Sequence, residues 1–160
     1  MSLTTQVCNP YLVANGNTEA VCVTTNGIVS PKTGRAIMGA GVAKFVRDNF
    51  PGIDTRLAKL LERYGNRVFN LGVYSYQGKT YRIISFPTKQ HWRNASEPQL
   101  IQTSAEQLVS LADKFQLSKV YLPAPGCSNG GLEWCDVSPL LSCLDSRFIV
   151  TSLNDKTFNN

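Results

Sequence analysis

The sequence predicts an α/β fold, a three-layer α/β/α sandwich in which helices cover both faces of a mixed central sheet. Three observations lead to this class. Short runs of apolar and β-branched residues alternate along the chain with segments whose apolar residues recur at helical spacing. The 160 residues, of which 42% are hydrophobic and 17% charged, can build a core and do not fit a disordered chain. The 12 Gly and 8 Pro residues follow no repeat, which excludes solenoid and collagen-like folds.

The first half of the chain predicts one buried strand and two helices. Residues Ala20–Thr25 form an apolar, β-branched run that ends at the turn dipeptide Asn26-Gly27, as expected of a buried strand. After a polar loop, the segment Gly41–Phe50 carries apolar residues at helical spacing and stops at Pro51-Gly52. A second helix is expected over Asp54–Tyr64, where leucines form an apolar stripe.

Five further segments are rich in the apolar and β-branched residues that are typical of strands, and turn residues separate them. The sequence therefore predicts strands at Arg67–Gly72, Val73–Tyr76, Thr80–Phe86, Lys119–Pro123 and Arg147–Leu153.

Two more helices are expected in the second half. Ser96 and Gln99 have the spacing of a capping box, and Pro98 suits the first turn of a helix because its missing N–H has no partner there. Apolar residues at helical spacing extend this helix to Phe115. A shorter helix is expected over Ser138–Leu144.

The cysteines indicate neither a disulfide framework nor a metal site. Their number is odd, no two form a Cys-x-x-Cys pair, and the chain has one histidine, His91. We therefore expect reduced thiols, no metal and no cofactor. The five are Cys8, Cys22, Cys127, Cys135 and Cys143.

The location of the protein is expected to be the cytoplasm, without membrane association. The segment Met1–Gln6 lacks the basic start and apolar stretch of a signal peptide. No apolar run approaches the roughly 20 residues that a membrane span needs.

Basic residues concentrate in the middle of the chain. Residues 32–93 hold twelve Lys and Arg but three Asp and Glu, a net charge of +9, whereas the rest of the chain has a net charge of −4. Such segregation steers anionic ligands such as a nucleic acid, a nucleotide or a phosphate. Solvated helix faces explain the same pattern equally well.

Two glycine-rich loops follow predicted strands, where ligands of α/β folds bind. Gly39, Ala40, Gly41 and Val42 lie immediately before or at the start of a helix, whose free N–H groups and dipole attract anions. Residues Gly126–Gly131 place three glycines in six residues after a strand, which suggests a backbone cradle for phosphates. A tight turn and an irregular surface loop are the alternatives. The second loop consists of Gly126, Cys127, Ser128, Asn129, Gly130 and Gly131.

A third group of candidate residues ends the strand Thr80–Phe86. Lys89 is a candidate phosphate ligand, surface charge or nucleophile, and the residues do not rank these roles. His91, Trp92 and Arg93 are possible rim groups for bases or phosphates, although packing explains them as well. A thiol hydrolase using Cys127 and His91 is a weaker hypothesis, because no cysteine-protease signature surrounds either residue.

Four motifs together resemble the macrodomain family of ADP-ribose-binding modules. In chain order they are Asn26-Gly27, Ile37-Met-Gly-Ala-Gly-Val-Ala43, Phe86-Pro-Thr-Lys-Gln-His-Trp-Arg93 and Leu122-Pro-Ala-Pro-Gly-Cys-Ser-Asn-Gly-Gly-Leu-Glu-Trp134. Their order and spacing match from about residue 20 to residue 150. Within the family the chain resembles the branch of the DNA ADP-ribosyl glycohydrolase antitoxins and the terminal ADP-ribose glycohydrolase. We therefore expect residues 1–160 to form a single macrodomain.

The resemblance implies roles for the candidate residues. ADP-ribose is expected in a cleft, with both glycine loops around its diphosphate and Asn26 near the distal ribose. Lys89 matches the lysine that attacks the anomeric carbon of that ribose in this branch. We expect an ADP-ribosyl hydrolase that acts on a modified macromolecule, with nucleic acid as one candidate, or alternatively a non-catalytic reader of ADP-ribose or a related nucleotide.

Two features depart from the family pattern. The terminal glycohydrolase has an acid/base aspartate in its second loop, whereas this loop offers Asn129, Gly130 and Gly131. The early acidic residue that reads adenine in many macrodomains also has no clear match, and Asn9 is the nearest candidate.

Overall fold

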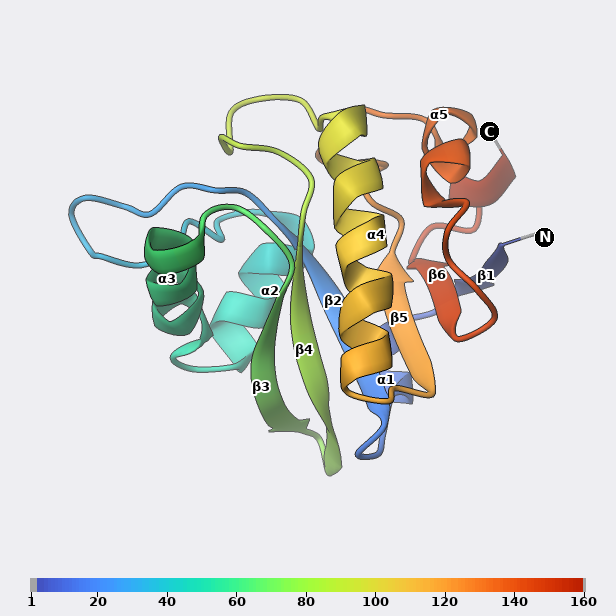
Figure 1. The fold of residues 1–160 in the computed structure, drawn as a ribbon, viewed down its shortest axis with the longest axis horizontal. Coiled ribbons are helices and arrows are strands. Elements are labelled where there is room, and N and C mark those ends of the chain that lie inside the picture. The colour runs from blue at the N-terminus through green and yellow to red at the C-terminus, as the bar shows by residue number, and fades with distance from the viewer. Residues whose placement is uncertain (1–2, 160) are drawn as a thin grey trace.

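The computed structural model describes residues 3–159, which form three layers around one sheet (Figure 1). The strands within this range are β1 (Thr4–Val7), β2 (Glu19–Thr25), β3 (Phe69–Tyr76), β4 (Lys79–Pro87), β5 (Lys119–Pro123) and β6 (Phe148–Ser152). The helices are α1 (Pro10–Val13), α2 (Gly41–Asn49), α3 (Ile53–Tyr64), α4 (Pro98–Lys114) and α5 (Trp134–Val137). Two short 3₁₀ helices, η1 (Ser138–Leu141) and η2 (Thr157–Asn159), complete the described elements.

The sheet is mixed, as the sequence predicts, and its strand order is β1-β6-β5-β2-β4-β3. Strand β2 lies inside the sheet and pairs in parallel with both β4 and β5. Strand β6 pairs in parallel with β5 and β1, and β3 is antiparallel to β4. The carboxyl ends of five strands therefore meet at the same edge of the sheet.

Alternate residues of β2 face two separate cores, which explains its continuous apolar sequence. Ala20 and Cys22 join the core under α4, α5 and η1, where Leu108 of α4 is fully buried. Val21 and Val23 join the core on the other face, under α1, α2 and α3. Figure 1 shows α4 across the front of the sheet, with α1 and α2 behind it. The predicted three-layer α/β/α fold is confirmed.

An aromatic cluster fastens α1 and α2 to the sheet. The Tyr11 hydroxyl donates a hydrogen bond to the Cys22 carbonyl oxygen at 3.2 Å. The Tyr81 hydroxyl in turn donates to the Tyr11 carbonyl oxygen at 3.0 Å. The rings of Tyr11 and Phe45 meet edge to face with centroids 5.0 Å apart, a favoured arrangement. These contacts hold α1 beside the middle of α2 and against β2 and β4.

No helix or strand is predicted before residue 20, yet β1 and α1 lie there. All four residues of β1 are exposed, so the strand lacks the apolar pattern by which strands are recognised. Helix α1 has four residues, too few to show helical periodicity. Pairing with β6, far away in the sequence, is what makes β1 a strand.

The two strands predicted over residues 67–76 are one strand, β3. The predicted break at Gly72 is a β-bulge, where the register with β4 shifts between Asn70 and Gly72. Gly72 has φ +114°, a conformation that favours glycine. The predicted turn after Tyr76 is confirmed, with Gln77 and Gly78 both at positive φ.

The predicted capping box is wrong. Helix α4 has Glu97, not Ser96, at its N-cap, and that side chain makes no capping hydrogen bond. Pro98 does occupy the first turn, as expected. Ser96 is instead buried against the loop that contains Gly130, whose carbonyl oxygen accepts from the Ser96 N–H at 3.0 Å.

The helix predicted over Ser138–Leu144 is also wrong in its bounds. A short α-helix over Trp134–Val137 runs into a 3₁₀ helix over Ser138–Leu141. Pro139 lies in the first turn of that 3₁₀ helix, where it cannot donate the N–H that a continuous α-helix would need.

No helix within residues 3–159 is long and apolar enough to cross a membrane.

Candidate functional site

A cleft of about 730 Å³ opens at the edge of the sheet where the parallel strands end. Its volume is typical of sites for small molecules and cofactors. Thr25 ends β2 and Asn26 follows it into the cleft, Thr88 and Lys89 follow β4, and Pro123 ends β5. The cleft brings together most of the predicted site residues: Asn26, Gly39, Ala40, Gly41, Val42, Lys89, Trp92, Gly126, Cys127, Ser128, Asn129 and Gly130.

Three of the predicted residues lie outside the cleft lining: Gly131, His91 and Arg93. His91 and Arg93 flank Trp92 at the tip of the loop between β4 and α4. The Arg93 guanidinium lies 4.7 Å from the centroid of the Trp92 ring, and the His91 ring stacks on it at 5.4 Å. These two residues therefore border the cleft through Trp92, which is 42% exposed.

The first glycine loop presents the N-terminus of α2 to the cleft. Gly41 opens the helix at φ +57°, and the Ala40 side chain makes no capping hydrogen bond. The first N–H with a backbone acceptor is that of Lys44, which donates to Ala40 at 3.2 Å. Within residues 3–159 no acceptor is recorded for the N–H groups of Gly41, Val42 and Ala43. Such groups at a helix start form an anion-binding site.

The second glycine loop keeps its shape because Gly130 packs tightly. A Cβ at Gly130 would lie 2.6 Å from the Gly126 Cα and would collide with the Ser96 hydroxyl. The turn is closed by the Leu132 N–H, which donates to the Gly126 carbonyl oxygen at 2.8 Å. Between these anchors Ser128 and Asn129 are exposed, and among the described residues their N–H groups have no recorded acceptor. The loop can therefore donate backbone hydrogen bonds to an anion.

The two loops approach each other across the cleft. A Cβ built on Gly41 would lie 2.5 Å from the Asn129 Nδ2. Glycine fits position 41 for two reasons: the backbone is left-handed there, and a side chain would collide with Asn129.

Asn26 is held in place by its own loop. Its Nδ2 donates to the Ile37 carbonyl oxygen at 3.0 Å, and its Oδ1 accepts from the Ile28 N–H at 2.9 Å. One N–H of the carboxamide remains for a ligand hydroxyl.

Lys89 enters the cleft from the end of β4. The Thr88 N–H donates to the Thr25 carbonyl oxygen at 3.0 Å, which extends the pairing of β2 and β4 up to the lysine. Lys89 is half-buried, and its Nζ donates to the Trp92 carbonyl oxygen at 3.5 Å. The described lining includes no Asp or Glu. The cleft therefore combines two sets of backbone donors with one amine, an arrangement suited to an anionic ligand.

Cys127 does not have the environment of a catalytic thiol. Burial, with smaller contributions from Glu133 and Asp136, raises the pKa of the Cys127 thiol to about 11. A thiol is nucleophilic as the thiolate, so this environment suppresses its reactivity near neutral pH. Because His91 lies outside the cleft lining, the hypothesis of a Cys127–His91 hydrolase has no support from the structure.

One end of the cleft was largely missed by sequence reasoning. Asn9, just after β1, lines the cleft and caps α1 by accepting from the Tyr11 N–H at 3.1 Å. Leu153 and Asn154 follow β6, and Phe45 reaches in from α2. Leu153 is 74% exposed, but single exposed apolar side chains are common on protein surfaces, so no local signal in the sequence marks this end of the cleft.

The comparison with protein families finds the Macro domain model over residues 29–141. The DNA ADP-ribosyl glycohydrolase of Mycobacterium tuberculosis is 27% identical to this chain over 133 residues. That match covers 81% of this chain but 38% of the relative, so the chain spans less than half the length of that protein.

Solved structures share the fold over almost the whole chain. The macrodomain of Mycobacterium tuberculosis DarG superposes with a TM-score of 0.71 at 26% identity and covers 94% of this chain and 97% of its own. Thermosipho africanus DarTG in complex with ADP-ribose superposes with a TM-score of 0.73 at 20% identity. The second match covers 99% of this chain and 46% of that one.

The environment of Cys127 generates a prediction about thiol reactivity. At pH 7.5 we expect iodoacetamide to alkylate the exposed Cys135 before Cys127, because a raised pKa leaves less thiolate on Cys127. Alkylation of Cys127 should accelerate as the pH rises toward 11. Peptide mass spectrometry over time measures both rates, and faster modification of Cys127 at neutral pH would contradict the prediction.

Proposed function

This chain belongs to the macrodomain family, and from that premise we propose that its cleft binds ADP-ribose and that Lys89 releases ADP-ribose from a modified macromolecule. The observation that carries the proposal is the convergence of two backbone anion sites and one amine in a single cleft. The DNA ADP-ribosyl glycohydrolase relative favours DNA as the macromolecule.

The diphosphate belongs between the two glycine loops. The N–H groups at the start of α2 and those of Ser128 and Asn129 face it from opposite sides, and no carboxylate of the described lining opposes it. Backbone donors and the helix dipole bind a phosphate without a side-chain cation.

The ends of the cleft suit the two ends of an elongated ligand. Leu153 lines the cleft just after β6, and we place the adenine at that end; the rings of Tyr11 and Phe45 also belong to the lining. Lys89 lies at the end of β4, three strands away from β6 in the sheet. At about 4.8 Å per strand this separation is about 14 Å, so a mononucleotide would leave one end empty.

The chemistry we propose begins with attack by the Lys89 amine on the anomeric carbon of the distal ribose. The C–N bond to lysine forms as the bond to the macromolecule breaks with its electron pair, and the proton lost by the amine passes through water to the leaving group. Water then attacks the same carbon as the C–N bond to lysine breaks, a proton from that water passes to the departing amine, and free ADP-ribose is released. Asn26 would hold the ribose through the free N–H of its carboxamide.

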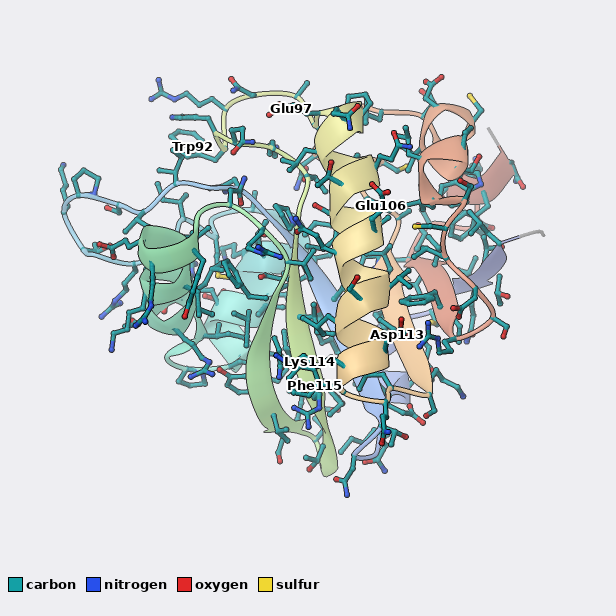
Figure 2. All side chains as sticks on the ribbon, in the orientation of Figure 1. Trp92, Glu97, Glu106, Asp113, Lys114 and Phe115 are labelled. Atoms are coloured by element: carbon teal, nitrogen blue, oxygen red, sulfur yellow. The ribbon has the colours of Figure 1, made fainter. Side chains whose placement is uncertain are left out.

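A nucleic acid fits the surroundings of Lys89. Trp92 is exposed at the tip of a loop that stands away from α4 (Figure 2), with Arg93 and His91 against its ring. Aromatic rings stack on bases, and cations beside them contact phosphates. The net charge of +9 over residues 32–93 gives the attraction that a polyanion requires.

A non-catalytic reader of ADP-ribose is the second candidate function. It is favoured by one observation, the lack of a carboxylate in the described lining that could act as acid or base. In this case Lys89 would serve as a phosphate ligand, and binding would occur without turnover.

The ligand assignment predicts that ADP-ribose binds at least tenfold more tightly than AMP, as measured by calorimetry. Gly41→Glu should weaken ADP-ribose binding more than tenfold, because the new side chain meets Asn129 and brings a negative charge toward the diphosphate. Gly34→Glu is the matched control: Gly34 also has a positive φ, and a Cβ there meets no atom within 4 Å. Equal affinity for AMP and ADP-ribose would contradict the assignment.

The nucleophile assignment predicts that Lys89→Ala lowers turnover of an ADP-ribosylated oligonucleotide at least 1,000-fold, while the Kd for ADP-ribose changes less than threefold. Lys89→Arg should be equally inactive, because a guanidinium stays protonated. The exposed Lys119→Ala is the control and should turn over normally. Loss of ADP-ribose binding in Lys89→Ala would instead support the reader.

The nucleic-acid substrate predicts a steep dependence on salt. With about three phosphate contacts to a single strand, a rise from 50 to 200 mM NaCl should raise KM about 20-fold. An ADP-ribosylated nucleoside, which lacks flanking phosphates, provides the control and should show a much smaller change. Equal salt dependence for both substrates would argue against a polyanion.

A further inference from the structure

We propose that Asn66, on the connection between α3 and β3, is a positioning residue that holds the backbone of Lys89 for its attack on the ribose. This inference rests on the proposed function of Lys89. Asn66 lies outside the cleft lining and 23 residues before Lys89 in the sequence. Its carboxamide nevertheless reaches the backbone that carries the nucleophile.

Two hydrogen bonds connect Asn66 to this backbone. Its Nδ2 donates to the Lys89 carbonyl oxygen at 3.1 Å and to the Gln90 Oε1 at 2.8 Å. A carbonyl oxygen accepts and never donates, so the amide end of the carboxamide must face Lys89. The Asn66 Oδ1 is buried and has no partner among the described residues. A buried, unpaired acceptor is unfavourable, so the two hydrogen bonds that Asn66 donates are the favourable polar contacts of its side chain.

Gly27 makes room for this contact. Its N–H donates to the Gln90 carbonyl oxygen at 3.0 Å, while a Cβ at Gly27 would lie 3.0 Å from the Asn66 Cγ and Nδ2. Any side chain at position 27 would therefore press on Asn66. Gly27 directly follows Asn26, which we place beside the ribose. The hydrogen bond from Gly27 to Gln90 therefore links the loop of Asn26 to the segment of Lys89.

The opposite side of the segment is held by Glu97. Its Oε2 accepts from the Gln90 N–H at 3.1 Å, and its own N–H donates to the Thr88 carbonyl oxygen at 2.8 Å. Thr88 and Gln90, on either side of Lys89, are thus held by hydrogen bonds to Glu97 at the start of α4, and Thr88 is also bonded to Thr25 at the end of β2. The carbonyl group of Lys89 itself is held by Asn66.

Loss of Asn66 should affect the chemical step more than binding. Among the described residues, the hydrogen bonds of Asn66 go to Lys89 and Gln90 and to neither glycine loop, so we expect the diphosphate site to remain intact without it. An amine displaced by about 1 Å from its line of attack loses about a hundredfold in rate. The expected signature is a lower kcat with an unchanged KM and an unchanged Kd for ADP-ribose.

The test compares Asn66→Ala and Asn66→Leu with Gln107→Ala. Gln107 accepts from the Val68 N–H at 3.0 Å, so it anchors the same connection to α4 without touching Lys89. We expect kcat on an ADP-ribosylated oligonucleotide to fall 30- to 100-fold in both Asn66 variants and less than threefold in Gln107→Ala. KM and the Kd for ADP-ribose should stay within threefold of wild type. The leucine variant fills the volume of the carboxamide, which guards against a loss of folding in the alanine variant.

Hydrogen exchange separates this inference from the proposed function. Amides of residues 88–91 should exchange faster in Asn66→Ala than in wild type or Gln107→Ala, whether or not the protein turns over substrate. Unchanged exchange would overturn the positioning role, as would a wild-type kcat in the Asn66 variants. A parallel loss of kcat and ADP-ribose affinity would also overturn it, because that pattern marks a general structural role. An inactive wild-type protein would overturn the proposed function alone.

Discussion

The parallel pairing of β2 with β4 on one side and β5 on the other is the constraint on which the rest of the site depends. Parallel strands end at the same edge, so the residues that follow each strand are brought together. Asn26 follows β2, Lys89 follows β4 and the second glycine loop follows β5. A one-residue shift of β4 against β2 would move Lys89 by about 3.3 Å and turn its side chain to the other face.

The glycines of the cleft allow close approach of backbone segments. Gly41 leaves room for Asn129, and Gly130 leaves room for Ser96 and Gly126. These contacts bring backbone N–H groups from two loops into one cleft. The proposed anion site would therefore depend on the absence of side chains at a few positions, and even an added methyl group would disturb it.

In the proposed function, the groups that bind the ligand are separate from the group that reacts with it. The described lining of the cleft offers an anion backbone donors on both sides, and it offers one amine, Lys89, at the end near β4. Cys127 lies in the same cleft, but burial raises the pKa of its thiol to about 11 and keeps it in the neutral form. Asn66 and Glu97 hold the backbone around Lys89 without entering the cleft. This site would direct the Lys89 amine by fixing the backbone around the lysine, without a second charged group.

The sequence by itself determined the fold class and most of the elements. The apolar run at Ala20–Thr25, the helical spacing after Gly41 and the hairpin turn after Tyr76 are local signals, because each depends on residues close together in the chain. The four motifs also predicted the family, and twelve of the residues drawn from them line the cleft. Local patterns and short motifs carried this information without any knowledge of distant contacts.

The tertiary structure alone decided what lies far apart in the sequence. Strand β1 exists because β6, more than 140 residues later, supplies its hydrogen bonds, and its exposed side chains carry no pattern of their own. Ser96 has the spacing of a helix cap, yet it packs on Gly130 because the second loop folds over it. Asn66 reaches the Lys89 carbonyl oxygen across 23 residues of sequence because the connection between α3 and β3 lies beside the end of β4. Strand register and packing determine which of these distant residues come into contact. A short stretch of sequence does not contain that information.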